Sequence, residues 1–431
     1  MPYLILPAKI KCFPLPKREV RYRRSSDLRD QTYSLALPNF LVSAFKSRFR
    51  TLLPLRGSSG ITPDSLLMSF LIRYLSMSFS TLPSYVKVLL CFAFFQMQAF
   101  AHLPSCYEQN FESVPLKYAK QFQLHQNTDT LKISFQKLSD VIFLSRSQIP
   151  NCKEAHTRTA LSSFALFSTT YLYPFEVLNG ADFVKGFANK QLISSVFWNQ
   201  HDLVELGETL RPEWLVSQKI SSLMLSPFFY DEQILQKSRR LGLAIFPNLD
   251  YLETTPLARL EWIKFFGAIL AKEKESQDFF QTVETGYIAL KNKLMDTTPL
   301  LIGHHYHGQW FAPGRDHELT QLIRHIGGQT AFMDLNGRGP YILNLEEIFL
   351  RAKATKLWLP MASWTSLAEG LMLDGKHHYL MKDKQVLLLK PTSGGFSYFE
   401  EGHYRPDLVA SDLLAIFQGE GELNYFVKVS P

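Results

Sequence analysis

The chain has 431 residues, of which 46% are hydrophobic and 20% are charged, a composition typical of a globular protein with room for two domains. Its net charge of +7 would favour a nucleic-acid partner if it were spread over the whole fold. However, residues 1–60 hold 12 Lys and Arg against 3 Asp and Glu, and the chain beyond residue 101 is mildly acidic. We therefore expect no nucleic-acid partner.

An apolar stretch within the basic front end, residues 88–101, has the layout of a secretory signal peptide. It follows Lys87 and ends in Ala99-Phe100-Ala101, which places small residues at the two positions that signal peptidase recognises. A buried or membrane-spanning helix is the alternative, but fewer than about 18 consecutive apolar residues and two glutamines disfavour a span. We therefore predict a signal peptide over residues 77–101 and export of the protein.

If the protein is exported, this has consequences for the residues before and after the signal peptide. Residues 1–76 would be an untranslated leader or a mistaken start, since a basic leader that contains Pro and Ser does not normally precede a signal peptide. Leu103-Pro104-Ser105-Cys106 partly matches a lipoprotein cleavage box, so a lipoprotein and a soluble form both stay open. In an oxidising compartment Cys106 and Cys152 can form a disulfide, and no CxxC zinc pattern is present.

The pattern beyond the signal peptide predicts an N-terminal α/β lobe over residues 115–270. Short strands at 131–135 and 141–144 are joined by polar residues suited to a hairpin, and a helix at 171–178 follows an apolar run. Strands and helices then alternate as parallel βαβ units do. The predicted elements are strands at 183–186, 223–226 and 243–246, with one helix that contains Glu213 and another that ends at Arg240.

A helical pattern replaces this alternation from Pro256 onward. The charged interval Lys272–Glu275 marks a break between two helices, and the second helix, over residues 271–295, is the predicted connector between lobes. A second α/β series over residues 296–420 forms the C-terminal lobe. Its predicted elements are strands at 300–303, 357–359 and 386–389, and helices at 318–326, 366–371 and 407–417. The predicted fold class is α/β, with two Rossmann-like lobes joined by a single long helix.

One sequence pattern occurs in both series. Arg211-Pro212-Glu213-Trp214-Leu215 leads into the apolar run 223–225, and Asn344-Leu345-Glu346-Glu347-Ile348 leads into 357–359 about as many residues later. Each copy places an acidic residue at the start of a short helix that precedes a buried strand. The repetition predicts two similar lobes that each show a carboxylate on the surface, with a groove between them. This arrangement suits carrying a ligand better than transforming one.

Three histidines, His304, His305 and His307, follow a predicted strand, where α/β proteins place groups that bind ligands. Imidazoles are common ligands of transition metals, but alternate residues of a strand face opposite sides, and no cluster of carboxylates or cysteines accompanies them. A pocket wall with hydrogen-bonding groups is therefore favoured. A receptor for a free transition-metal ion that uses these three histidines stays the alternative.

Aromatic residues recur at the predicted strand-to-helix junctions. Trp310 and Phe311, followed by a Pro-Gly turn and Arg315, suit a cleft that stacks on a flat or apolar ligand and neutralises its acidic groups. A core-packing Trp-Phe pair with a surface arginine is the alternative. The candidate ligand-binding residues are Tyr171, Tyr173, Phe228, Tyr230, His305, Tyr306, Trp310, Arg315, Tyr341 and Trp364.

Common enzyme signatures are missing from the sequence. There is no GxGxxG after a strand, no GxxxxGK[ST], no HExxH and no GxSxG. Asp250, Glu253 and Glu261 lie close in sequence, but helical spacing is expected to scatter them, so no acid–base pair is predicted. We expect neither catalysis nor an intrinsic cofactor. An enzyme with two Rossmann-like lobes, such as a glycosyl transferase, is the less favoured alternative.

The order and spacing of seven segments between about residues 115 and 418 resemble those of a known protein family. They are Lys117–Phe122, Arg211–Leu215, Leu241–Leu243, Asn248–Glu253, Pro256–Lys264, Trp310–Gly314 and Leu345–Ile348. In this respect the chain resembles the periplasmic substrate-binding proteins (class III) of ABC importers for iron-siderophore complexes, haem and vitamin B12. It departs from them at Ile220-Ser221-Ser222, where Pro-Asp is usual, and at Lys356, where an acidic residue is frequent. These departures leave the fold intact and the substrate open.

The resemblance implies a periplasmic, monomeric protein that holds its ligand between two lobes bridged by one rigid helix. The ligand would be a metal chelate, such as a ferric siderophore or a cobalamin-like compound, delivered to the permease of an ABC importer. In that family one glutamate on each lobe docks into arginines of the permease. These glutamates fall on Glu213 and on Glu346 or its neighbour Glu347. Helix-start glutamates favoured by the helix dipole are the alternative.

Overall fold

The computed structural model describes residues 103–147, 150, 152–157, 163–295, 298–392 and 395–429, all of which belong to one compact unit. The predicted leader (1–76) and signal peptide (77–101) lie outside the described residues. Across the described ranges, no helix combines the length and the apolar character needed to cross a bilayer. We call the described residues before 271 the N-terminal lobe and those from 298 onward the C-terminal lobe.

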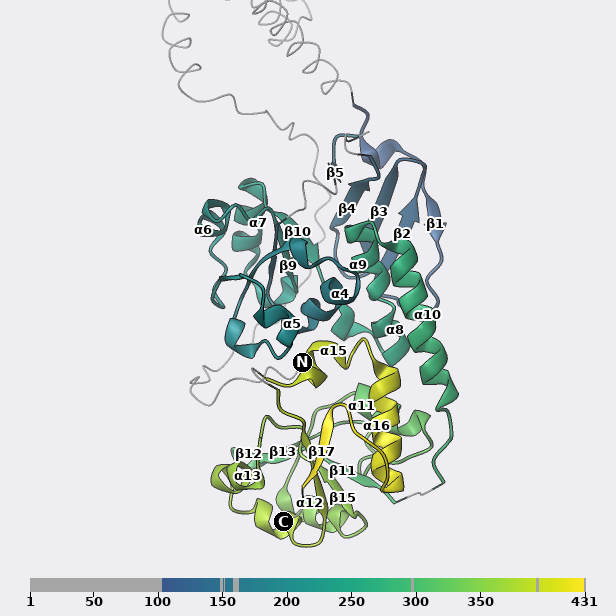
Figure 1. Cartoon of the computed structure of the whole chain (residues 1–431), viewed down its shortest axis with the longest axis vertical. Helices are drawn as coiled ribbons and strands as arrows, with labels where there is room; N and C mark the ends of the chain where they lie inside the picture. The colour runs from purple at the N-terminus through teal and green to yellow at the C-terminus, as the bar shows by residue number, and fades with distance from the viewer. Residues whose placement is uncertain are drawn as a thin grey trace, which may run out of the picture. The chain divides into compact units, whose positions relative to one another are not determined.

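The N-terminal lobe begins with a five-stranded, mostly antiparallel sheet (Figure 1). Its strands, in spatial order, are β1 (Glu112–Val114), β2 (Phe122–Gln126), β3 (Thr130–Phe135), β4 (Val141–Ser145) and β5 (Ala155–Thr157). The antiparallel pairing of β3 with β4, in which Ile133 lies opposite Ile142, confirms the predicted hairpin. β1, β2 and β5 were not predicted; in β1 and β5, three residues are too few to establish a period of two.

A second five-stranded sheet in this lobe is entirely parallel, with the order β10-β9-β6-β7-β8. Its strands are β6 (Phe164–Leu166), β7 (Val184–Phe187), β8 (Val204–Glu205), β9 (Ser222–Leu225) and β10 (Ala244–Pro247). The helices are α4 (Leu172–Val177), α5 (Val196–Asn199), α6 (Pro212–Ser217) and α7 (Glu232–Arg240). Every residue of β6 and β9 is buried, which explains the apolar runs 164–166 and 223–225. The predicted parallel βαβ units are confirmed.

Three helices follow the parallel sheet: α8 (Pro256–Leu260), α9 (Ile263–Leu270) and α10 (Glu273–Ala289). The predicted break is confirmed, since Ala271 adopts the left-handed conformation with φ of 58° and ends α9. α10 packs against α9 and also against α16 (Pro406–Gln418) of the C-terminal lobe, so it connects the lobes (Figure 1). A side chain at Gly267 of α9 would place its Cβ 2.1 Å from the Ser276 Oγ of α10, so only glycine permits this close packing.

The C-terminal lobe contains a four-stranded sheet with the order β11-β15-β16-β17 and a separate three-stranded antiparallel sheet, β12-β13-β14. The strands are β11 (Leu300–Ile302), β12 (His305–Tyr306), β13 (Gln309–Ala312), β14 (Tyr341–Leu343), β15 (Leu357–Leu359), β16 (Gln385–Leu389) and β17 (Phe426–Val429). The helices besides α16 are α11 (Glu318–His325), α12 (Leu345–Ala352), α13 (Leu367–Leu373), α14 (His377–Met381) and α15 (Ser397–Glu401). β11, β15 and β16 are parallel and were predicted, whereas the antiparallel β17 was not.

Two buried carboxylates hold the segment that leads into β2. Glu261 accepts hydrogen bonds from the backbone N–H groups of residues 117, 118 and 119 at 2.9, 2.7 and 2.8 Å. Glu253 accepts from the N–H groups of residues 120 and 121 at 3.0 and 2.9 Å, and from the indole of Trp262. The expectation that helical spacing scatters Glu253 and Glu261 was wrong, because the turn before α8 and the break before α9 direct both side chains to one segment. Their role here is to anchor backbone.

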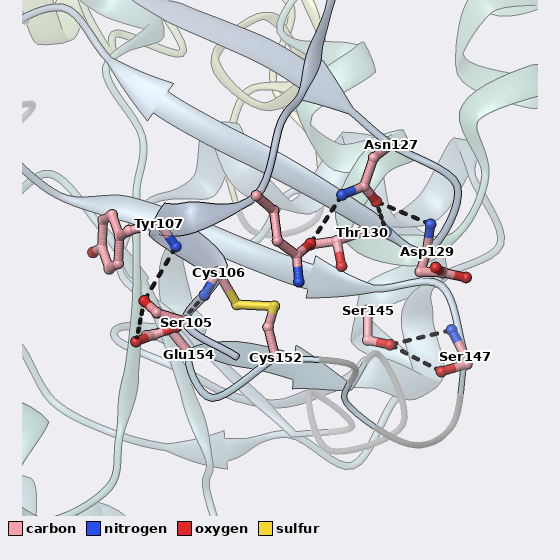
Figure 2. The surroundings of a disulfide bond; sticks show 11 residues. Ser105, Cys106, Tyr107, Asn127, Asp129, Thr130, Ser145, Ser147, Cys152 and Glu154 are labelled. Atoms are coloured by element: carbon pink, nitrogen blue, oxygen red, sulfur yellow. Dashed lines mark hydrogen bonds between the residues drawn. A yellow bond between two sulfur atoms is a disulfide. The ribbon is translucent and has the colours of Figure 1, made fainter. Parts of the chain in front are cut away.

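A disulfide between Cys106 and Cys152 ties the start of the described chain to the loop before β5 (Figure 2). Beside it, the Glu154 carboxylate accepts hydrogen bonds from the Ser105 hydroxyl at 3.0 Å and from the Cys106 N–H at 2.7 Å (Figure 2). The sequence left this pairing open as a possibility, and the structure contains it. A sulfur bonded in a disulfide cannot carry the thioether-linked lipid of a lipoprotein, so in this structure Cys106 is not available as a lipidation site.

The disulfide should contribute strongly to stability, because it closes a loop between cysteines 46 residues apart. Replacing both cysteines (Cys106→Ser with Cys152→Ser) is expected to lower the free energy of unfolding by about 3 kcal/mol. Urea denaturation of the oxidised wild type and the variant measures the difference, and reduced wild type should behave like the variant. Identical midpoints for all three proteins would contradict this assignment.

Candidate functional site

Segments that follow the parallel strands of the two lobes meet in the structure. In the N-terminal lobe, β6 is followed by the short helix η4 (Thr169–Tyr171), and β10 by the short helix η8 (Asp250–Leu252). In the C-terminal lobe, β16 is followed by α15, and α15 packs against η4 and α4. Ligands of open α/β sheets bind beyond the carboxyl ends of the strands. The region where these ends come together is therefore the candidate binding site.

A buried guanidinium joins the lobes at this region. The Nε of Arg259 donates to the Asp250 carboxylate at 3.0 Å, and its Nη1 donates to the Glu318 carboxylate of α11 at 2.7 Å. The Nδ1 of His403 lies 3.2 Å from the same carboxylate of Glu318. Burial alone would raise the pKa of Glu318, but the charges of Arg259 and His403 outweigh burial and hold this pKa well below its usual value. The ionised pair is thus the stable form across the interface.

Exposed aromatic side chains gather after β9 in the N-terminal lobe. Phe228 and Phe229 are 52% and 54% exposed, and the Phe229 ring stacks on Tyr251 at 5.8 Å. Tyr230 is half-buried, with its ring edge-on to Phe167. Large apolar groups that remain open to solvent beyond a strand are available to cover a ligand. Phe229 and Tyr251 join the predicted Phe228 and Tyr230 in this group.

The other two predicted tyrosines of this lobe lie deeper. Tyr171 is buried and Tyr173 is half-buried. Desolvation by burial, with the nearby Asp250 carboxylate, raises the pKa of Tyr171 well above its ordinary value, so its hydroxyl stays neutral. A direct contact of either tyrosine with a ligand stays a prediction.

The C-terminal lobe brings a second group together after β11. The His305 Nδ1 is hydrogen-bonded to the Asp374 carboxylate, and the backbone N–H of His305 donates to the Nε2 of His377 at 3.1 Å. The Nδ1 of His377 lies 2.7 Å from the Gly370 carbonyl, so His377 is a neutral imidazole that donates from Nδ1 and accepts at Nε2. Asp374 and His377 were missed, because nothing local in the sequence links them to a loop some seventy residues earlier.

The other predicted residues of this loop differ in exposure. His304 lies with its ring 5.2 Å from Trp364, and its Nδ1 is 2.9 Å from the Pro360 carbonyl. Trp364 is buried, whereas Tyr306 is 45% exposed. His307 is exposed in a left-handed turn with φ of 47°. Tyr306 and His307 are therefore the predicted residues of the loop that are open to a ligand in this conformation.

These histidines do not converge on one point. His304 and His305 bind different partners, as described above, and His307 lies in the exposed turn. Within the described ranges, no group of three or more His, Cys, Asp or Glu side chains is arranged to hold a metal ion.

Trp310, Arg315 and Tyr341 lie around the three-stranded sheet. Trp310 is fully buried, stacks on Trp358 at 6.3 Å and donates its indole N–H to the Ile302 carbonyl at 3.1 Å. Arg315 donates to the Asn336 side chain at 3.2 Å, and the Tyr341 hydroxyl donates to the Asn336 carbonyl. Trp310 thus belongs to the core of the lobe in this conformation, whereas Arg315 and Tyr341 are half-buried and share Asn336 as a partner. Ligand contact by these three residues stays a prediction.

The repeated acidic motif forms the start of a helix in each lobe. Glu213 lies in the first turn of α6, half-exposed, with its carboxylate 2.5 Å from the Lys237 ammonium. Glu347 is hydrogen-bonded to Arg351 at 2.8 Å, and Arg351 also binds Asp334. Glu346 is exposed and forms no hydrogen bond or ion pair within the described part of the chain. Of the two neighbours, Glu346 is therefore the one free to bind another protein.

A cavity of about 490 Å³ opens on the first sheet, away from these groups. Its lining residues are Asn110, Phe111, Glu112, Gln126, Asn127, Thr128 and Arg146. None of them is a predicted ligand residue, and none follows a strand of the entirely parallel sheet.

No family model matches the chain. It is 28% identical over 237 residues to an uncharacterised lipoprotein of Methanocaldococcus jannaschii and 23% identical over 190 residues to an uncharacterised protein of the same organism. These matches cover 52% and 42% of the chain, and they span only 56% and 57% of the two relatives. A solved periplasmic binding protein from Veillonella parvula superposes with a TM-score of 0.51 and 14% identity, over 69% of this chain and 100% of that one.

The structural likeness defines the fold. The chain has the two-lobed α/β fold of class III periplasmic binding proteins, as the resemblance in sequence implied. The predicted fold class, with two lobes of parallel sheet joined by a single long helix, is confirmed.

The bridge through Arg259 predicts a large cost when the guanidinium is removed. Arg259→Met leaves the carboxylates of Asp250 and Glu318 buried without their partner, which should lower the free energy of unfolding by about 3 to 5 kcal/mol at neutral pH. Combining Arg259→Met with Glu318→Gln should recover part of this loss. Urea denaturation measures both variants, and a variant Arg259→Met as stable as wild type would contradict the assignment.

The same bridge predicts a dependence of stability on pH. The folded pKa of Glu318 is depressed below its ordinary value of 4.5, so its stabilising contribution is present above that value and declines as the pH falls through the lower folded pKa. Urea midpoints measured from pH 7 down to pH 3 should therefore fall more steeply for wild type than for Glu318→Gln. Parallel curves would count against an ionised Glu318 in the interface.

Proposed function

We propose that the protein is the extracytoplasmic solute-binding component of an ABC importer, and that it captures a metal chelate such as a ferric siderophore or a cobalamin-like compound. The observation that carries the proposal is the meeting of strand carboxyl ends from two lobes of the periplasmic-binding-protein fold. The predicted signal peptide at 77–101 supports export to the periplasm. The lipoprotein name of one relative is consistent with a place outside the cytoplasm.

The surface chemistry of the two lobes supports a large, partly apolar ligand. Phe228 and Phe229 of the N-terminal lobe and Tyr306 of the C-terminal lobe are each about half exposed. Aromatic faces cover flat or apolar ligand surfaces, and a guanidinium such as that of Arg315 neutralises acidic groups. The chain supplies no catalysis in this proposal. The ligand is cargo rather than a cofactor, and the protein works as a monomer.

Isothermal titration with a panel of ferric chelates and cobalamins tests the ligand class. We expect at least one chelate to bind with a Kd in or below the micromolar range, and Zn²⁺, Mn²⁺ and Ni²⁺ ions alone to bind more weakly. Phe228→Ala with Phe229→Ala should weaken binding of that chelate about tenfold, because the apolar cover is lost. Tyr107→Ala, at an exposed tyrosine of the short helix Cys106–Glu108 before the first sheet, is the matched control and should bind normally.

Two outcomes would contradict the ligand class. One is tight binding of a bare metal ion that is lost on replacing His304, His305 and His307 with alanine. The other is equal affinity of the Phe228/Phe229 variant and wild type for the chelate that binds.

Docking on the permease is proposed for Glu213 and Glu346, which lie at the first turns of α6 and α12. Two carboxylates, one on each lobe, would fix the orientation of the protein on cationic groups of the permease. Docking requires Glu213 to exchange its Lys237 partner, a small cost because that pair is half-exposed.

Glu213→Ala with Glu346→Ala should leave chelate affinity unchanged and abolish uptake of labelled chelate in cells that carry the importer. Glu347→Ala is the internal control, since Glu347 is engaged by Arg351. It should transport normally while losing some stability. Full uptake in the Glu213/Glu346 variant would remove the docking assignment, and loss of uptake in Glu347→Ala alone would transfer the role to Glu347.

A further inference from the structure

A segment of the C-terminal lobe packs onto the N-terminal lobe. We call residues 395–405 the strap; it contains α15 and leads into α16. α15 packs against η4 and α4 of the N-terminal lobe (Figure 1). Tyr404 of the strap is fully buried, with its ring 6.5 Å from Tyr173 and 6.1 Å from Phe266. The strap therefore joins the lobes independently of α10.

A carboxylate of the strap caps backbone groups of the other lobe. Glu400 is 4% exposed and accepts hydrogen bonds from the N–H groups of Ser194 and Ser195, the latter at 3.0 Å. Ser195 is the N-cap residue of α5, and its hydroxyl donates to the Glu176 carboxylate of α4 at 3.2 Å. Glu400 and Glu176 thus approach the same serine from different lobes. If the strap moves away, Glu400 passes from a buried position into water.

The electrostatic surroundings of Glu400 disfavour its charged form. Burial raises the pKa of Glu400 to about 7 against the opposing effect of the two N–H donors, and the like charge of Glu176 adds to the increase. Burial also raises the pKa of Glu176, opposed by Ser195 and by His201 of the same lobe. On the strap side, the nearest titratable residues in sequence are Glu401, His403 and Arg405. His403 lies beside Glu318, and Arg405 is paired with Asp407. No Lys or Arg forms an ion pair with Glu400 within the described ranges.

We propose that Glu400 and the backbone N–H groups of Ser194 and Ser195 form a pH-sensitive latch between the lobes, which tightens when Glu400 is protonated and loosens when it ionises. Glu400 binds a proton more tightly in the latched state than in the released state, where its pKa has the ordinary value of 4.5. The latched state therefore gains stability as the pH falls from above 7 towards 4.5 and loses that gain as the pH rises again. The latch is a property of the chain itself and does not depend on the identity of a ligand.

Hydrogen exchange of the full chain measures the latch directly at the peptide that contains residues 193–199. After correction for intrinsic exchange, we expect wild type to be about tenfold or more better protected at pH 5.5 than at pH 8.5. Glu400→Gln lacks the titrating carboxyl at this position, so its protection should not change with pH over this range. Glu420→Gln, at an exposed glutamate near the end of α16, is the matched control and should follow wild type.

Two results would overturn the latch. The first is equal protection of the peptide at both pH values in wild type, a measurement that needs no variant and so does not depend on whether Glu400→Gln folds. The second is a folded Glu400→Gln variant that keeps the pH dependence of wild type. Protection that falls as the pH rises in wild type and is flat in Glu400→Gln supports the proposal.

Discussion

The buried ion pair from Arg259 to Glu318 is the contact on which the relation between the lobes depends. A guanidinium with this little exposure must be paired, and Asp250 and Glu318 supply partners from opposite lobes. Asp250 follows β10 and Glu318 begins α11, so the pair holds the carboxyl end of one sheet against the first turn of a helix of the other lobe. The depressed pKa of Glu318 shows that the charged form is the one this arrangement stabilises.

The contacts between the lobes differ in their chemistry, and this difference suggests how the molecule works. The Arg259 bridge is ionic and buried, and α10, which connects the lobes, packs so closely against α9 that there is no room for a side chain at Gly267. The strap is held through Glu400 by two hydrogen bonds to backbone N–H groups, without an ion pair. The Arg259 bridge is thus a fixed connection between the lobes, whereas the strap is a connection that the proposed latch makes sensitive to pH.

Much of the fold could be predicted from local patterns. The apolar runs 223–225 in β9 and 386–389 in β16, the charged interval at the start of α10, and the prolines that begin α6, α8 and α16 are short-range signals that the structure follows. The rest depends on contacts between distant residues. Nothing near Glu261 shows that it binds residues 117–119, and nothing near Asp374 shows that it binds His305. The sequence also could not decide between Glu346 and Glu347, which differ only in whether Arg351 reaches them.

The central claim is that a ligand is held jointly by segments that follow the parallel strands of the two lobes. The most direct measurement is a crystal structure of the protein purified from its own host with its native ligand retained. The account predicts a bound chelate in contact with residues after β9 in one lobe and after β11 in the other. A ligand held entirely within one lobe, for example in the cavity on the first sheet beside Phe111, would contradict it.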